Sequence, residues 1–145
     1  MATFTLEADA AAPPETVFEV LADHRGYARI SRIRKAELER EGDPPPNGVG
    51  AIRKLTSIGP PLREEILEFV PNERLRYTLL SGAPMKDHFG TVTLTPNGAS
   101  GTHVAYRIDT EPKIKPLAPL AVRITRTAVK QLLDGIVREA ERRAG

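Results

Sequence analysis

The feature of this sequence that most constrains its fold is a run of six strand-like segments followed by one long helical segment. From about residue 33 onward, apolar and polar residues alternate with the period of strands that bury one face: RKAELERE, GAIRKLTSI, LREEILEF, RLRYTLLS, DHFGTVTLT and THVAYRIDT. The stretches between them, which include GPP, VPNE, GAP and PNGASG, are short and rich in turn-forming residues. We therefore expect neighbouring strands to pair as antiparallel hairpins.

The segment from about Pro116 to Arg143 has the apolar spacing of one long helix. Pro116 and Pro119 are at its start, where a helix tolerates proline. Its apolar stripe comprises Ile124, Ala128, Val129, Leu132, Leu133, Ile136 and Ala140. An antiparallel sheet with one apolar face must be covered on that face, and only this segment is long enough to cover it. Because a curved sheet around a single helix leaves space between the two, we expect an internal cavity.

The first 30 residues supply a further strand and two short helical segments. ATFTLEAD alternates and predicts a strand over residues 2–9. AAPPETVFEVLAD predicts a helix, with Pro14 in its first turn and Glu15 near its positive end. HRGYARI predicts a second, short helical turn. A chain of 145 residues is the size of one domain. We predict a single α+β domain over residues 1–145, with a curved antiparallel sheet of six to seven strands around the C-terminal helix.

The composition excludes several kinds of function. The 21 basic and 19 acidic residues are interleaved and aromatic residues make up 5%, which argues against a nucleic-acid partner. The absence of cysteine excludes disulfides and thiol chemistry and fits a cytoplasmic protein. We find no signal-peptide pattern and no run of about 18 apolar residues, so we expect no membrane span. We expect the arginines of the last helix to form a solvated face; peripheral contact with anionic lipid headgroups is the alternative.

No motif points to a particular enzyme class. The sequence lacks GxSxG, HExxH and a glycine-rich phosphate loop. The three histidines are isolated from one another in the sequence, so we expect no metal and no cofactor. We predict that His24 interacts with the carbonyl groups that end the first helix, and that His103 is exposed.

Arg53 and Glu64 are the candidate charged residues of the cavity. A buried arginine binds a ligand carboxylate or carbonyl well, whereas a surface position on a strand is the alternative interpretation. Glu64 is on the next predicted strand, and an ion pair with Arg53 would offset the cost of burying either charge alone. A shift of one residue in the hairpin register would reverse the faces, so Glu65 remains an alternative to Glu64.

His88, Tyr77 and Tyr106 are the candidate polar groups on the strands. His88 alternates with Val92 and Leu94, and histidine suits general acid–base catalysis near neutral pH. Its position at the start of a strand also fits a hydrated residue at the rim of the sheet. The two tyrosines have apolar residues two positions away, which fits either core packing or a hydroxyl offered to a ligand.

Four strings, in order along nearly the whole chain, carry a family resemblance: APPETVFEVLADHRGYARI, GVGAIRKL, LREEILEFVPNERLRYTLLSGAP and FGTVTLTPNGASGTHVAYRI. They resemble the helix-grip superfamily (SRPBCC), which includes START lipid-transfer domains, birch-pollen-allergen-like proteins and the polyketide cyclase/dehydrase group. Glu64 matches the glutamate of that pattern. The sequence differs from many relatives in having Tyr106 where they have tryptophan, and Tyr27 or Ile30 must replace another tryptophan in the second helix.

The resemblance implies two alternative functions. The first is non-enzymatic binding of a small-to-medium hydrophobic ligand, such as a lipid, polyketide-like or isoprenoid compound, between the sheet and the last helix. The second is a cyclase, aromatase or dehydratase reaction with His88 and Arg53 as acid–base and electrophilic groups. The candidate ligand-binding residues are Arg53, Glu64, Tyr77, His88, Val92, Tyr106, Leu120, Ile124, Ala128 and Leu132. The sequence indicates neither the ligand nor an oligomeric state.

Overall fold

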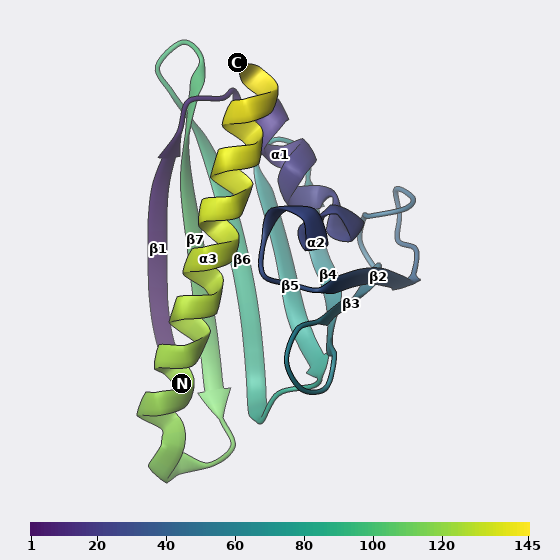
Figure 1. Cartoon of the computed structure of the whole chain (residues 1–145), viewed down its shortest axis with the longest axis vertical. Helices are drawn as coiled ribbons and strands as arrows, with labels where there is room; N and C mark the ends of the chain where they lie inside the picture. Colours follow the sequence, from purple (N-terminus) through teal and green to yellow (C-terminus); the bar gives the residue numbers. More distant parts are fainter.

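The computed structural model describes residues 1–145 and contains one antiparallel sheet of seven strands (Figure 1). The strands are Ala2–Ala10 (β1), Lys35–Arg40 (β2), Ile52–Thr56 (β3), Leu62–Val70 (β4), Arg74–Ser81 (β5), Met85–Asn97 (β6) and Gly101–Pro112 (β7). Their spatial order is β1-β7-β6-β5-β4-β3-β2, so the first strand pairs with the last and all other neighbours are consecutive hairpins. The six consecutive strands expected from the alternation are confirmed.

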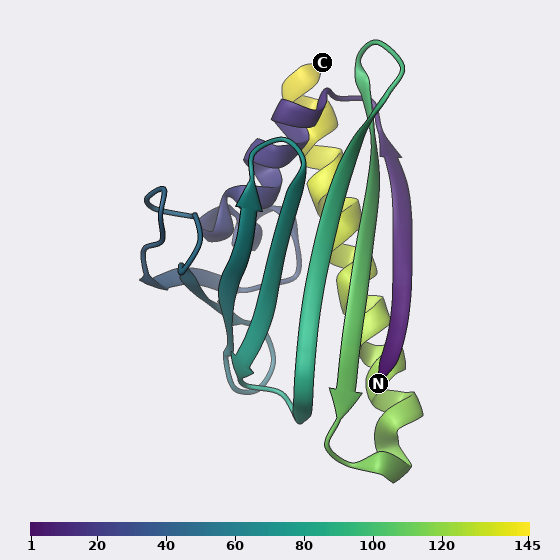
Figure 2. The ribbon, with the colours of Figure 1, turned by 180° about the vertical axis from the view of Figure 1, so that it is seen from behind.

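The helical segments are Pro14–Ala22 (α1), His24–Gly26 (η1), Tyr27–Ile30 (α2), Lys115–Leu117 (η2) and Ala118–Ala144 (α3). α3 lies along one face of the sheet, and α1 and α2 lie beside it on the same face (Figures 1 and 2). The opposite face of the sheet carries no helix (Figure 2). The predicted α+β helix-grip architecture is therefore confirmed. No helix combines the length and the apolar character that are needed to cross a bilayer.

The core lies between the sheet and the C-terminal half of α3. The helix residues buried there are Val129, Leu132, Leu133, Gly135, Ile136 and Ala140. The first turns of α3 differ, since the residues Leu120 and Ile124 are 53% and 61% exposed. The expectation that Ile124 belongs to a stripe packed on the sheet is wrong, because Ile124 lines a cavity that separates this part of α3 from the strands.

Candidate functional site

A cavity of about 390 Å³ lies between the sheet and the first half of α3. Of the 22 residues that line it, 13 are hydrophobic. The polar residues of its sheet wall are Arg53, Glu64, Tyr77, His88 and Tyr106, each on a different strand from β3 to β7. The cavity therefore has the mainly apolar lining, with a few convergent polar groups, that is typical of small-molecule sites.

The register of the strands decides which polar side chains face this cavity. Arg53 on β3 is directly opposite Glu64 on β4, so the two side chains share one face of the sheet. Glu65 is on the other face, where its carboxylate lies 3.5 Å from Arg40. The alternative that the sequence leaves open is thereby resolved in favour of Glu64.

Arg53 is the most highly connected polar residue of the site. Only 1% of its side chain is exposed, and its Nε donates a hydrogen bond of 2.9 Å to Glu64 Oε1. Its Nη1 donates to the Tyr27 hydroxyl at 3.1 Å and to His24 Nδ1 at 3.2 Å. The guanidinium carbon also lies 4.5 Å from the centre of the Tyr77 ring, within the range of a cation–π interaction. This one side chain thus joins β3 to β4, to β5 and to the η1–α2 segment.

These contacts keep Arg53 charged in spite of its burial. Burial alone would lower the pKa of the guanidinium, but Tyr27 and Glu64 raise that pKa above its ordinary value. The charge of Arg53 is therefore compensated inside the protein by Glu64. Glu64 occupies the Nε side of the guanidinium and Nη1 is hydrogen-bonded to Tyr27 and His24, which leaves Nη2 without a hydrogen bond to the protein.

His24 completes this network as a neutral side chain. An arginine can only donate, so His24 Nδ1 accepts from Arg53, and Nε2–H donates to the Asn47 carbonyl oxygen at 3.0 Å. Burial, and then the nearby charge of Arg53, lower the pKa of His24 to about 3. The prediction that His24 interacts with the end of the first helix is wrong, because η1 turns its fully buried ring toward β3.

Tyr77 and Tyr106 form the floor of the cavity. Their hydroxyl groups lie 2.7 Å apart in a buried hydrogen bond, and burial raises the pKa of both phenols. Tyr77 is opposite Gly90 in the β5–β6 ladder, and a Cβ atom at Gly90 would overlap the Tyr77 ring. Glycine is therefore required at position 90 for the ring to lie across β6 and reach Tyr106.

His88 is buried rather than hydrated at the rim. Its side chain lines the cavity, and its residue exposure is 8%. His88 Nδ1 is hydrogen-bonded to Thr110 Oγ1 at 2.9 Å, whereas its Nε2 makes no hydrogen bond to the protein. Burial lowers the pKa of His88, so the ring is neutral near pH 7. His88 therefore presents an available ring nitrogen to the cavity.

The structure brings together most, but not all, of the residues expected at a ligand site. Those that line the cavity are Arg53, Glu64, Tyr77, His88, Tyr106, Ile124, Ala128 and Leu132. Val92 lies outside it, since it is further along β6 and is only 1% exposed within the packed core. Leu120 is also outside the lining, because its side chain is exposed on the first turn of α3.

Sequence reasoning missed the contribution of His24 and Tyr27 to the polar network. Tyr27 donates to the Leu21 carbonyl oxygen at 2.6 Å and accepts from Arg53, so its hydroxyl joins α1 to β3. The available signal was the spacing of three residues between His24 and Tyr27, which places both side chains on one side of a helical turn.

An antiparallel sheet and a long helix that enclose a mainly apolar cavity define the helix-grip class of domain. A family model described as polyketide cyclase / dehydrase and lipid transport matches residues 1–143. The chain belongs to this family, as its sequence strings indicate. No curated protein matches the sequence.

Solved structures share the fold at low sequence identity. A protein from Thermus thermophilus is 22% identical, with a TM-score of 0.77 over 99% of this chain and 100% of the other. A START superfamily protein from Mycobacterium smegmatis is 16% identical, with a TM-score of 0.77 over 94% and 97%. Norcoclaurine synthase from Thalictrum flavum is also 16% identical, with a TM-score of 0.78 over 99% and 96%. At these identities the similarity establishes the fold alone.

Replacing His24 with asparagine should make the fold less sensitive to acid. Between the ordinary pKa of 6.5 and the folded value of about 3, the unfolded chain binds a proton that the folded chain does not. The His24 contribution to the free energy of unfolding therefore falls by up to about 1.4 kcal/mol per pH unit as the pH drops through this window. Urea denaturation at about pH 7 and about pH 5 should show a smaller difference in the variant than in the wild type.

His103 provides the control with the opposite sign. It is partly exposed, and its hydrogen bonds to Asp9 and Glu7, both 2.9 Å, raise its pKa. A raised pKa stabilises the fold at low pH, so His103→Asn should increase acid sensitivity. An unchanged pH dependence in His24→Asn would contradict a buried neutral His24.

Replacing Glu64 with glutamine should strongly destabilise the fold, because Arg53 would remain buried without its carboxylate. We expect a loss of about 3–5 kcal/mol in the free energy of unfolding, measured in urea. Glu39→Gln is the matched control, since it breaks an exposed pair of 2.7 Å between Glu39 on β2 and Arg63 on β4. Its effect should be a small fraction of the Glu64 effect. Equal losses in the two variants would argue against a special role for the buried pair.

Proposed function

We propose that this chain binds one small-to-medium hydrophobic molecule in the cavity between its sheet and α3, without catalysing a reaction. The observation that carries the proposal is a mainly apolar cavity whose two buried charged groups, Arg53 and Glu64, are paired with each other. An apolar ligand would release water from this lining without displacing an internal ion pair. A lipid, a polyketide-like compound or an isoprenoid has the required character.

The volume of the cavity limits the size of the ligand. About 390 Å³ is near the lower end of the roughly 300–1,000 Å³ that is usual for small-molecule sites. This supports a single acyl chain or a compound of a few fused rings in preference to a membrane lipid with two chains. The hydroxyl groups of Tyr77 and Tyr106 and the ring of His88 would orient a polar atom of such a ligand.

Replacing Ala128 with tryptophan tests the location of the ligand. Ala128 is exposed on α3 and lines the cavity, so a large side chain there would occupy part of the binding volume. We expect at least a ~10-fold loss of affinity for any hydrophobic compound that binds the wild type, since the added side chain competes for the same space. Native mass spectrometry and displacement of a fluorescent apolar dye would measure this.

Thr127→Trp is the matched control for Ala128→Trp. Thr127 is the preceding residue on α3, is exposed and does not line the cavity. Its variant should retain wild-type binding. Equal binding by the two tryptophan variants, or no binding of any apolar compound by the wild type, would contradict the proposal.

One observation supports a second candidate function, a cyclase or dehydratase type of reaction. His88 Nε2 has no protein partner and faces the cavity as part of a neutral ring, as a general base requires. Of the Tyr77 and Tyr106 hydroxyls on the same wall, one donates to the other, and the second O–H is available to donate to a carbonyl oxygen. Norcoclaurine synthase from Thalictrum flavum, which has this fold, is an enzyme.

Proton exchange at the carbon next to a carbonyl would test this second function. If His88 is a general base, the wild-type protein should accelerate deuterium incorporation into a small apolar ketone such as acetophenone, followed by NMR in deuterium oxide. His88→Asn should lower the accelerated rate by about 10²-fold. His103→Asn, on the outer face of β7, should leave the rate unchanged. A His88→Asn rate equal to that of the wild type would remove His88 from the role.

A further inference from the structure

A second hollow lies next to the cavity, in a cleft of about 720 Å³ between α2, the residues that follow it, and the second half of α3. Its lining residues are Arg29, Ile30, Ser31, Arg32, Gln131, Asp134, Gly135, Arg138, Glu139 and Arg142. Three of them, Ser31, Arg32 and Gln131, also line the apolar cavity. The cleft and the cavity therefore adjoin each other at these three residues, and Arg32 lies at the boundary between them.

The close approach of α2 to α3 fixes this junction. A Cβ atom at Gly135 would collide with the carbonyl oxygen of Ile30, so only glycine allows α2 to end directly against the backbone of α3. Ser31 and Arg32 follow Ile30 immediately and are thereby held at the boundary between the two hollows.

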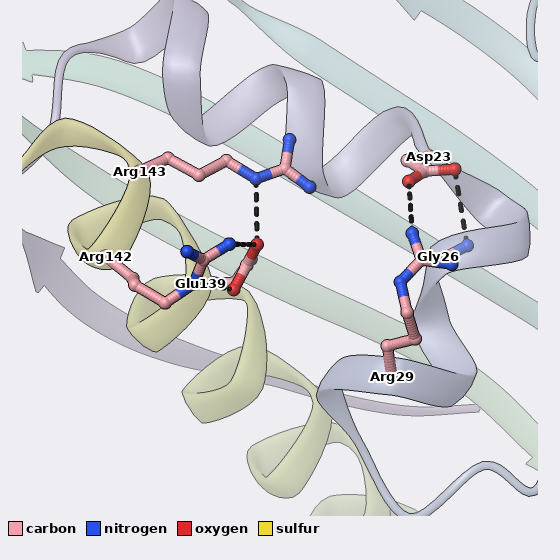
Figure 3. A network of polar contacts seen from close by, with 6 residues as sticks. All are labelled: Asp23, Gly26, Arg29, Glu139, Arg142 and Arg143. Atoms are coloured by element: carbon pink, nitrogen blue, oxygen red, sulfur yellow. Dashed lines mark hydrogen bonds and ion pairs between the residues drawn. The ribbon is translucent and has the colours of Figure 1, made fainter.

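The acidic residues of the cleft are already neutralised by other residues. Glu139 accepts hydrogen bonds of 2.8 and 2.7 Å from Arg142 and one of 2.9 Å from Arg143 (Figure 3). Asp134 is paired with Lys130 at 3.0 Å. Neither carboxylate is therefore free to compensate another arginine of the cleft.

Two arginines of the cleft, in contrast, have no acidic partner. No carboxylate lies within 4.0 Å of the Arg32 or Arg138 guanidinium groups. Arg29 has only a long contact of 3.4 Å with Asp23, shown in Figure 3. The cleft thus carries uncompensated positive charge beside a cavity in which the buried charges of Arg53 and Glu64 balance each other.

We propose that the ligand is an amphiphile with an anionic end group, a carboxylate or a phosphate. Its apolar part lies in the cavity, and its end group is bound by Arg32 and Arg138 in the cleft. This rests on the binding function proposed above and adds the class of the ligand. The charged end belongs in the cleft because inside the cavity it would meet the Glu64 carboxylate and lose hydration, with Arg53 already paired. Arginine forks are well suited to both end groups.

Three probes with the same ten-carbon chain separate the contribution of the anionic end group to the affinity from that of the apolar chain. They are decanoic acid, decyl phosphate and decanol. Their affinities for the full chain would be measured by isothermal titration calorimetry at low salt and below their aggregation concentrations. We expect at least one anionic probe to bind about 5-fold or more tightly than decanol, as charge-assisted hydrogen bonds require. This preference should shrink at high salt, because the arginines are solvent-exposed. The tighter of the two anions identifies the end group.

The double variant Arg32→Gln/Arg138→Gln should abolish the preference for the anionic probe. Arg126→Gln is the matched control, because Arg126 is on the same helix but lies over the Phe4 ring, 5.5 Å from its centre, and does not line the cleft. It should retain the wild-type preference. The readout is the ratio of the anion and alcohol affinities, and circular dichroism would establish that each variant is folded.

The possible failures are distinguishable. Equal binding of decanol and both anions by the wild type would overturn the anionic end group while leaving the hydrophobic-ligand function intact. A preference that survives in the double variant would overturn the assignment to Arg32 and Arg138. If none of the three probes binds, both this inference and the proposed function are wrong.

Discussion

The buried ion pair between Arg53 and Glu64 is the constraint on which the rest of the site depends. Burying one of these charges without the other would cost several kcal/mol, so β3 and β4 must pair in the one register that places them face to face. Nη1 of Arg53 then finds its acceptors in the η1–α2 segment, where it donates to His24 and Tyr27. The Arg53 guanidinium thereby connects the η1–α2 segment to strands β3 and β4.

This network also explains why a cavity lies under the N-terminal half of α3, whereas the C-terminal half is packed against the core. The C-terminal half of α3 packs directly on the core, and Gly135 brings it against the end of α2. Toward its N-terminus the helix instead faces the polar side chains of β3 to β7, which are large and held in place by hydrogen bonds with one another. Side chains fixed in this way cannot collapse onto the helix, and the cavity remains between them.

The sequence was sufficient for the fold but not for the arrangement of the site. The strands and α3 were predictable because alternation and helical spacing are local patterns that survive in any register. The choice between Glu64 and Glu65 was not predictable, since a shift of one residue leaves the alternation unchanged. The burial of His24 depends on Arg53, which is 29 residues away, and on the turn that η1 makes. Leu120 was misplaced because helical spacing does not reveal where a helix leaves the sheet.

The polar side chains of the site fall into two groups: those that are paired within the protein and those that have no partner. Proteins with this architecture include a START superfamily protein and a synthase, so the architecture alone does not decide between binding and catalysis. The polar groups that the folded chain leaves unpaired are therefore the ones that bear on the choice between binding and catalysis. Here Arg53 is hydrogen-bonded to both Glu64 and His24, so these contacts contribute to the fold. The groups without a partner include His88 Nε2 in the wall of the cavity, the Arg32 guanidinium at the boundary with the cleft, and the Arg138 guanidinium in the cleft. The amphiphile proposed above matches this distribution, because its apolar body would lie beside His88 in the cavity and its anionic end beside Arg32 and Arg138.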